Sequence, residues 1–209
     1  NGSEISLTSS AGPWQGTVPL YGYFNMINMI LAIMSVASLG YPIPALLELT
    51  AQLSAPAGRL QTWRHPQGGL IVVDYAHTPD GLTAVLKTLK PYVQGELYCV
   101  FGCGGERDRS KRPLMAQAVE QFADQIILTQ DNSRAESLKQ ITDDIMAGFS
   151  AGMTVSIEPD RLKAIQLGLA NMQASDCLLI AGKGHETVQH IDGVELPFSD
   201  IKVIEDYLC

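Results

Sequence analysis

The sequence predicts an α/β fold whose main part is a doubly wound, mainly parallel, Rossmann-like sheet, preceded by a smaller unit. Short apolar runs recur between residues 70 and 181, and each is apolar throughout, as in strands buried on both faces. The segments between these runs are long enough for a helix, which favours parallel strands joined by helical crossovers. The stretch Ser54–Gly58 is typical of a linker, so we expect domains at residues 1–55 and 56–209.

The smaller unit is expected to contain a hairpin and two helices. Residues 4–20 place Gly12-Pro13 between β-prone pieces, which indicates a hairpin or the end of a sheet. Apolar residues recur at helical spacing over Phe24–Leu39 and stop at Gly40, and a second helix is expected over Ile43–Leu53.

The larger unit is expected to alternate strands with helices. The predicted strands are Leu70–Asp74, Leu97–Phe101, Gln125–Thr129, Thr154–Ile157 and Cys177–Ala181. A hairpin that turns at Asp192-Gly193 and a helix over about Ser199–Leu208 close the chain.

The composition excludes several classes of protein. With 209 residues, 46% hydrophobic and 17% charged, the chain is able to bury a core, and its formal net charge of -8 argues against a nucleic-acid partner. The longest apolar stretch, Met26–Leu39, contains Asn28 and is too short to span a membrane. The chain opens with Asn1 instead of an initiator Met and without a signal region, so we expect a part of a longer protein.

The cysteines point to a reducing compartment. Four cysteines are too few and too scattered for a disulfide framework, and three of them lie in or beside apolar runs. We therefore expect a cytoplasmic protein.

The first loop of interest follows the strand Leu70–Asp74. Thr78 fits a helix N-cap, with Pro79 at the first helical position. Asp74 and His77 are then free to hydrogen-bond a ribose or a purine edge. The alternative is that Asp74 caps a turn and His77 is merely exposed.

The second loop, Gly102–Pro113, combines glycines with four basic side chains. Its glycines let a ligand approach the backbone, and its basic residues offer sites for carboxylate or phosphate. A dinucleotide fingerprint does not fit, because Arg107 stands where Gly or Ala is needed. The alternative is a solvated basic loop with a Gly-rich turn.

The third loop follows the strand Gln125–Thr129. Ser133 and Glu136 have the spacing of a capping box, so we expect Ser133 to cap the next helix. Asp131, Asn132 and Arg134 offer an acceptor, an amide and a bidentate cation, which suit a zwitterionic amino acid.

The fourth loop, Gly182–Glu186, follows the strand Cys177–Ala181. It is not a phosphate loop, because Cys177 and Gly184 stand where that motif needs Gly and Ser or Thr. Glu186 is instead a candidate acceptor for an ammonium group of the ligand.

Together with two further motifs, these loops resemble the Mur ligase family, most closely its diaminopimelate-adding members. The resemblance covers nearly the whole chain, and the ordered set is more specific than any one motif. The matching segments are Gly22–Asn28 with two asparagines three apart, Gly58-Arg59, Asp74–Asp80, Gly102–Pro113 and Gly182–Glu186.

The resemblance implies a role for each matching position. ATP is expected to contact Asn25, Asn28, Arg59, Asp74 and His77. meso-Diaminopimelate is expected to contact Arg107, Asp131, Asn132, Ser133, Arg134, Gly182 and Glu186. Lysine-adding relatives lack the arginine of the third loop, so Arg134 favours diaminopimelate. Ser133 departs from the family pattern Asp-Asn-Pro-Arg, and we expect Arg134 to keep its place.

The resemblance also implies what lies outside this chain. In the family the phosphate loop, the carbamylated lysine and the Mg²⁺ ligands belong to a central ATP-binding domain, and the UDP-sugar to an amino-terminal one. Nothing in the 209 residues matches these motifs. Residues 1–55 are thus expected to be the end of the central domain, and the chain to contain no catalytic residue and no metal ligand.

The implied reaction adds meso-diaminopimelate to UDP-N-acetylmuramoyl-L-alanyl-D-glutamate at the expense of ATP and Mg²⁺, in peptidoglycan synthesis. Two alternatives stay open. A related ligase would add lysine or another amino acid, as folate-adding relatives do, and a nucleotide-binding module would lack catalysis.

Overall fold

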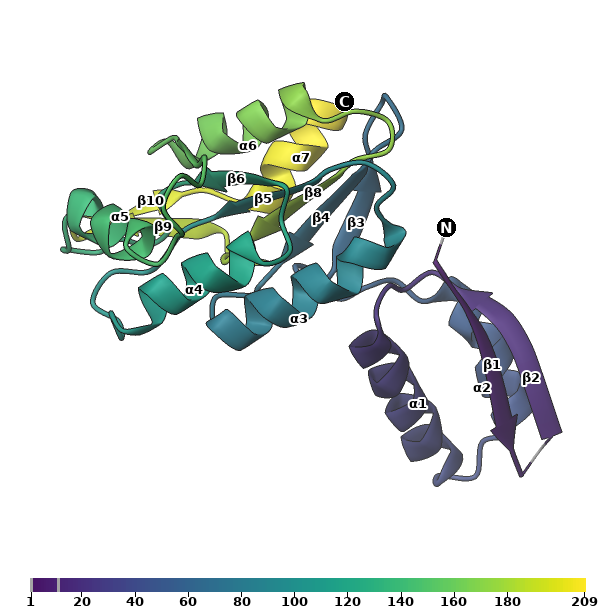
Figure 1. Cartoon of the computed structure of the whole chain (residues 1–209). Coiled ribbons are helices and arrows are strands. Elements are labelled where there is room, and N and C mark those ends of the chain that lie inside the picture. The colour runs from purple at the N-terminus through teal and green to yellow at the C-terminus, as the bar shows by residue number, and fades with distance from the viewer. Residues whose placement is uncertain (1, 11) are drawn as a thin grey trace. The chain divides into compact units, whose positions relative to one another are not determined.

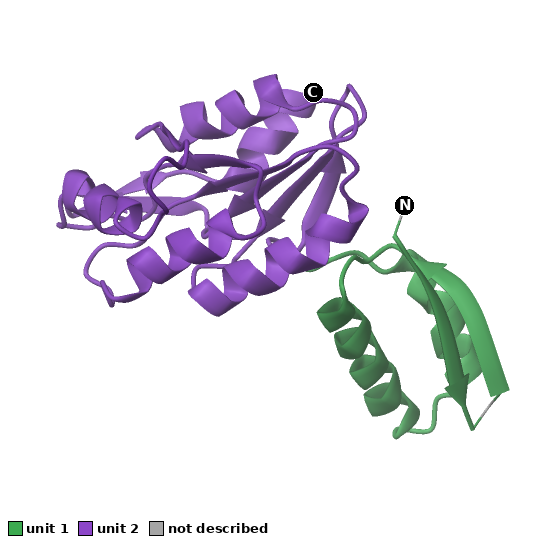
Figure 2. Cartoon of the chain, viewed as in Figure 1, with its two compact units in different colours: residues 1–56 green, residues 57–209 purple. Residues whose placement is uncertain are grey.

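A computed structural model describes residues 2–10 and 12–209. The chain divides into two compact units, residues 1–56 and residues 57–209, which Figure 2 shows in different colours. Among the described residues, no helix has the length and apolar character that a membrane crossing needs.

The smaller unit contains the hairpin and the two helices that the sequence predicts. Its elements are β1 (Ser3–Ser9), β2 (Gly12–Val18), α1 (Tyr23–Ala37), α2 (Ile43–Leu49) and the short 3-10 helix η1 (Thr50–Gln52). β1 and β2 pair antiparallel. The expected second helix is therefore divided into α2 and η1. Val18, Leu20 and Met29 form a small core.

The larger unit is built on a six-stranded sheet in the order β3-β4-β8-β5-β6-β7 (Figure 1). The strands are β3 (Gln61–Arg64), β4 (Leu70–Asp74), β5 (Leu97–Phe101), β6 (Gln125–Leu128), β7 (Ser156–Ile157) and β8 (Cys177–Ala181). Every pairing in this sheet is parallel except that of β3 with β4. The predicted α/β fold with a mainly parallel sheet is confirmed.

Helices cover both faces of this sheet, as a doubly wound fold requires. They are α3 (Pro79–Leu89), α4 (Lys111–Glu120), α5 (Leu138–Met146), α6 (Arg161–Asn171) and α7 (Asp200–Leu208), with the 3-10 helix η2 (Lys90–Tyr92) after α3. α3 and α4 lie on one face and α6 and α7 on the other (Figure 1). The predicted cap is present, since the Thr78 hydroxyl accepts from the Gly81 amide at 3.1 Å.

Two hydrophobic cores follow from the alternation of side chains along the strands. In β8, Leu179 packs with α3, α4 and α5, whereas Leu178 and Ile180 pack with α6 and α7. Because successive side chains point to opposite faces, a run that is apolar throughout supplies both cores. This rigid sheet holds the loops at its carboxyl edge.

A second hairpin follows β8. It consists of β9 (Val188–Ile191) and β10 (Val194–Pro197), which pair antiparallel around Asp192-Gly193 as predicted. Both turn residues have positive φ, 50° and 75°, which is the geometry of a tight hairpin turn.

The sequence does not predict the edge strand β3. Gln61, Thr62 and Arg64 are polar, so the strand lacks the continuous apolar run of a buried strand. β7 has only two residues, fewer than expected, and both are exposed.

Candidate functional site

A cleft of about 420 Å³ lies at the carboxyl edge of the sheet and is lined by all four loops that the sequence singles out. Asp74 is the last residue of β4, Gly102 follows β5, Gly182 follows β8, and Asp131 comes three residues after the end of β6. This is where open α/β sheets bind ligands. Seven of the predicted site residues line this cleft: His77, Arg107, Asp131, Asn132, Arg134, Gly182 and Glu186.

The third loop is held against strand β9. The Arg134 amide donates to the His190 carbonyl at 2.9 Å, and the Asp192 amide donates to the Arg134 carbonyl at 2.7 Å. Arg134 itself has a φ of +54°, which is uncommon for a residue with a side chain. The loop is thus kept in a costly conformation by contacts from another part of the chain.

The guanidinium of Arg134 is anchored at one nitrogen. Its Nη1 donates to the carbonyl oxygens of Gly105 at 2.8 Å and of Asn132 at 3.2 Å. Among the described residues no carboxylate pairs with it, so the edge formed by Nε and Nη2 is available. That edge has the geometry for a bidentate pair with a carboxylate.

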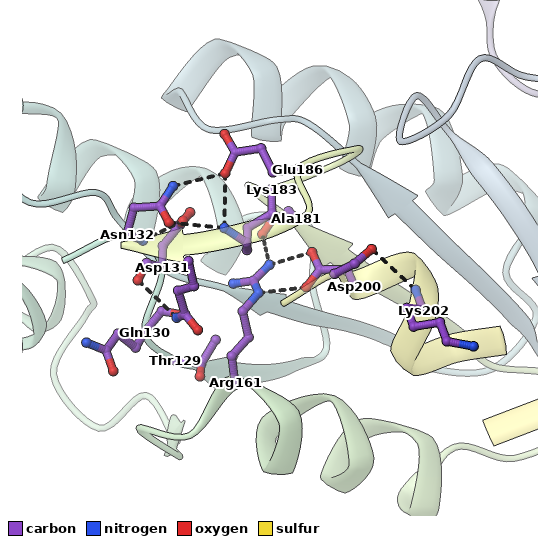
Figure 3. Close-up of polar contacts among 12 residues, drawn as sticks. Thr129, Gln130, Asp131, Asn132, Arg161, Ala181, Lys183, Glu186, Asp200 and Lys202 are labelled. Atoms are coloured by element: carbon purple, nitrogen blue, oxygen red, sulfur yellow. Dashed lines mark hydrogen bonds and ion pairs between the residues drawn. The ribbon is translucent and has the colours of Figure 1, made fainter. Parts of the chain in front are cut away.

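The fourth loop places two charges beside the third loop, as Figure 3 shows. Lys183 is fully buried, and its Nζ lies 3.0 Å from Glu186 Oε2. The same Oε2 accepts from Asn132 Nδ2 at 2.9 Å. The other oxygen of Glu186, Oε1, accepts nothing from the described part of the chain, which leaves it for an ammonium group.

The carboxyl of Glu186 is held in its charged form. Burial by itself would raise the pKa of Glu186, but the hydrogen bonds from Asn132 and Lys183 and the Lys183 charge outweigh burial and lower the pKa below its usual value. Glu186 therefore contributes a negative charge to the cleft.

Gly182 makes room at the start of the same loop. Its φ is +115°, and a Cβ there would lie 2.7 Å from Asp131 Oδ2. A side chain would collide with the third loop, so glycine is needed for the two loops to approach each other.

The second loop contributes a free cation. Arg107 lines the cleft, is exposed, and has no hydrogen bond or ion pair with any described residue. Together with Arg134 it gives the cleft two guanidinium groups that protein carboxylates do not neutralise.

Two other basic residues of this loop are not available, which corrects the expectation that all four provide ligand sites. Arg112 is 2% exposed and pairs through Nη1 with Glu136 at 2.6 Å and with Asp144 at 2.8 Å. Arg109 pairs with Asp144 at 2.9 Å. These ion pairs connect α4 and the residues before it with the third loop and α5, so both arginines stabilise the fold instead of binding a ligand.

The prediction that Ser133 caps the next helix is wrong. Helix α5 begins at Leu138 after Ser137, and no side chain caps it. The Ser133 hydroxyl accepts instead from Gln130 Nε2 at 2.8 Å, and the Glu136 carboxylate is used by Arg112 and by the Glu106 amide. The Ser133 hydroxyl is therefore used within its own loop, and the Glu136 carboxylate is used by the second loop and α4. Ser133 does not line the cleft, although its neighbours do.

Asp74 holds the backbone at the first loop. Its Oδ2 accepts from the Leu60 amide and its Oδ1 from the Ala76 amide, both at 2.8 Å. Burial raises the pKa of Asp74, and these hydrogen bonds with the Arg59 charge oppose that rise. This is the turn-capping geometry that the sequence left open for Asp74.

Tyr75 lies at the centre of a group of nitrogen-bearing side chains. The Arg59 guanidinium stacks over its ring at 4.7 Å, and the ring centroids of His77 and His185 lie at 4.6 Å and 5.5 Å. Arg59, Asp74 and His77 are therefore neighbours through Tyr75 and the turn that precedes α3.

Asn25 and Asn28 belong to the smaller unit. Both lie on α1, three residues apart and so on one side of the helix. Asn25 donates to the Tyr21 carbonyl at 3.0 Å, and Asn28 is exposed.

Sequence reasoning missed the buried charges that hold the loops. Arg161 and Asp200 form a fully buried ion pair at 2.8 Å, and Arg161 Nη2 also binds the Ala181 carbonyl at 3.0 Å, immediately before Gly182 (Figure 3). For Lys183 the available signal is its place two residues after the strand Cys177–Ala181, which is apolar throughout, because such a position is buried and a buried charge needs partners.

The cleft thus combines two free guanidinium groups with carboxylate oxygens that accept no hydrogen bond from the described residues, among them Glu186 Oε1. Arg107 and Arg134 suit two carboxylates, and Glu186 suits an ammonium group. A small amino acid with an additional carboxylate satisfies this set.

Comparison with known proteins agrees with these motifs. Residues 58–184 match the family model described as Mur ligase, glutamate ligase domain. A curated relative from Haemophilus influenzae, a UDP-N-acetylmuramoyl-L-alanyl-D-glutamate--2,6-diaminopimelate ligase, is 46% identical over 207 residues, which is 99% of this chain and 42% of that protein. The chain therefore spans less than half the length of this relative.

Solved structures agree at the level of the fold. A structure of a UDP-N-acetylmuramoyl-L-alanyl-D-glutamate--2,6-diaminopimelate ligase matches with a TM-score of 0.74 and 43% identity, over 97% of this chain and 42% of that one. The folylpolyglutamate synthase of Mycobacterium tuberculosis, solved with ADP and AMPPCP, matches with a TM-score of 0.67 and 22% identity, over 87% of this chain and 42% of that one. The match to the family model and the identity to the ligases show that the chain belongs to the Mur ligase family.

Proposed function

We propose that the chain is the amino-acid-binding part of a longer ligase that adds meso-diaminopimelate to UDP-N-acetylmuramoyl-L-alanyl-D-glutamate in peptidoglycan synthesis. The observation that carries this proposal is the free Nε and Nη2 edge of Arg134 in a cleft that also contains Arg107 and Glu186. Diaminopimelate has one more carboxylate than lysine, and Arg134 is the group that would recognise it. The relative from Haemophilus influenzae bears the name of this activity.

In this reaction a carboxylate oxygen of the dipeptide attacks the γ-phosphorus of ATP, a P–O bond forms, and ADP leaves. The amino group of diaminopimelate then attacks the acyl phosphate, so that a C–N bond forms, phosphate leaves and the amine loses a proton. Within this scheme the chain supplies orientation. Arg107 and Arg134 would grip carboxylates and Glu186 an ammonium group, which brings the attacking amine to the acyl phosphate.

The nucleotide is assigned to a different set of residues. We propose that ATP contacts Asn25, Asn28, Arg59, Asp74 and His77, and that Mg²⁺ is bound mainly by regions of the enzyme outside this chain. The arrangement of Arg59 and His77 around the Tyr75 ring supports a purine or ribose site there. Asp74 would act mainly by holding the turn, since backbone amides already occupy both of its oxygens.

The two units receive different domain assignments in this proposal. Residues 1–55 would be the end of the central ATP-binding domain and residues 56–209 the carboxyl-terminal domain. We place the enzyme in the cytoplasm, where ATP is available and where the free thiols of the buried Cys99, Cys103 and Cys177 persist.

Binding of meso-diaminopimelate and of lysine to the protein, measured by calorimetry, tests the proposed substrate. We expect binding of diaminopimelate and much weaker binding of lysine. Equal affinity, or a preference for lysine, would favour a related ligase that adds another amino acid.

A further inference from the structure

The ammonium group of Lys183 has three partners in a fully buried site. Nζ donates to the Val188 carbonyl at 2.6 Å, to Glu186 Oε2 at 3.0 Å and to Asn132 Oδ1 at 3.1 Å. An ammonium group has three donors, so all of them are used. Lys183 is absent from the lining of the cleft. It is therefore a bridge inside the protein and has no donor left for a ligand.

The three partners belong to three different segments. Asn132 is in the third loop, Glu186 is in the fourth, and Val188 begins β9. Figure 3 shows Lys183 between Asn132 and Glu186, which both line the cleft. Through the contact with Val188, the same group ties them to the hairpin that also holds the Arg134 backbone.

The bridge fixes the orientation of the Asn132 amide. Its Oδ1 accepts from Lys183 and also from the His190 amide at 3.0 Å, so Nδ2 must face Glu186. With the oxygen and the nitrogen assigned in this way, Asn132 presents a donor at the cleft and cannot turn its acceptor there.

The bridge also orients the carboxylate of Glu186. Oε2 receives two hydrogen bonds, one from Lys183 and one from Asn132, which leaves Oε1 as the oxygen that is free for a ligand. A buried ammonium group stays charged only when it has a partner such as a carboxylate. The ion pair with Lys183 therefore also fixes the position of the Glu186 carboxylate.

We propose that Lys183 is a positioning residue for the amino-acid substrate, which fixes Glu186 in the geometry that binds the substrate ammonium group and holds Asn132 with its amide donor toward Glu186. This inference rests on the proposed function. It assigns Lys183 no contact with ATP and no part in the chemical step, so its removal should affect one substrate selectively.

The test is steady-state kinetics of the full-length ligase with Lys183→Met, which shortens the unbranched side chain by one atom and removes the charge. We expect the KM for diaminopimelate to rise by about tenfold to a hundredfold, as for the loss of a charge-assisted hydrogen bond, with the KM for ATP changed less than about twofold. The matched control is Lys139→Met, because Lys139 is exposed on α5 and, within residues 2–10 and 12–209, pairs only with Asp143. This variant should leave the KM values for diaminopimelate, for ATP and for the UDP-N-acetylmuramoyl dipeptide unchanged.

A double-mutant cycle with Glu186→Gln separates positioning from a general structural role. If Lys183 acts through Glu186, adding Lys183→Met to Glu186→Gln should raise the KM for diaminopimelate far less than it does in the wild-type enzyme. If Lys183→Met alone does not fold, the double variant, which leaves no unpaired carboxylate, is compared with Glu186→Gln alone. Similar KM values for diaminopimelate then support the inference, and a further rise of about tenfold or more contradicts it.

Three outcomes would overturn the inference. The first is an unchanged KM for diaminopimelate in Lys183→Met, and the second is an equal increase in the KM values of all substrates. The third is a double variant whose KM for diaminopimelate rises by the product of the two single fold-changes. Failure of the proposed function looks different, because the wild-type enzyme would then prefer another amino acid. The Lys183 variants are in that case judged by the KM of the amino acid that the enzyme does use.

Discussion

Arg134 Nη1 lies 2.8 Å from the carbonyl oxygen of Gly105, so the cation of the third loop is anchored to the backbone of the second. The Gly105 amide donates in return to the Asn132 carbonyl at 2.9 Å. A Cβ on Gly105 would collide with the Ser133 carbonyl, so only glycine permits this approach. The two loops thus present Arg107 and Arg134 as a connected pair.

Replacing Arg134 by Ala should reduce the preference for diaminopimelate over lysine. The free edge of its guanidinium would pair with the carboxylate that lysine lacks, and such a pair is worth about 1.5 to 3 kcal/mol, or about tenfold to a hundredfold in discrimination. The measurement is kcat/KM of the full-length enzyme with each amino acid.

Arg107→Ala is the control for this selectivity. If Arg107 grips the carboxylate that every amino acid shares, its loss should lower kcat/KM for both amino acids by a similar factor. A selectivity that stays the same in Arg134→Ala would contradict the role given to Arg134.

Arg112→Met should destabilise the protein. It leaves the carboxylates of Glu136 and Asp144 without the buried cation between them, at a cost of about 2 to 3 kcal/mol, less than for a fully buried pair because both carboxylates are partly exposed. Urea unfolding of the wild type and the variant measures the difference. Arg109→Met, at an arginine that is 56% exposed, should lower the free energy of unfolding much less than Arg112→Met does, because solvent screens its ion pair.

Stability should fall in acid through the same cluster. The hydrogen bond from Arg112 lowers the pKa of Glu136 to about 2, and that from Arg109 lowers the pKa of Asp144 to about 2. Carboxyls with a lowered pKa stabilise the folded state above their ordinary pKa near 4, and this contribution is lost as the pH falls toward 2. Unfolding midpoints measured between pH 2 and pH 7 should show the loss, and Arg112→Met should make the dependence shallower. A variant with the wild-type slope would rule out this cluster as the cause.

The 209-residue chain alone should neither hydrolyse ATP nor ligate an amino acid. Neither of its glycine-rich turns matches a phosphate loop, because Gly102–Pro113 has no Gly-Lys pair and because Cys177 and Gly184 stand where the motif needs Gly and Ser or Thr. Magnesium-dependent phosphate release from the purified chain, above the level of a buffer control, would refute this expectation.

The sequence alone was sufficient for the fold and for the location of the cleft. The runs 70–73, Leu97–Phe101 and Cys177–Ala181 are apolar throughout because both of their faces are buried, and this pattern is local. Since parallel strands end at one edge, the loops that follow them had to meet there. The polar strand β3 has no such local pattern and was missed.

The tertiary structure decided which charged side chains are free. Arg107 and Arg112 belong to one basic loop, but only Arg112 meets Glu136 and Asp144, which come from a distant part of the chain. Ser133 and Glu136 have the spacing of a capping box, yet each has a partner that lies outside that motif. The partner of a charge depends on residues far away in the sequence, and burial, which sets how strongly a charge needs a partner, exists only after the chain has folded.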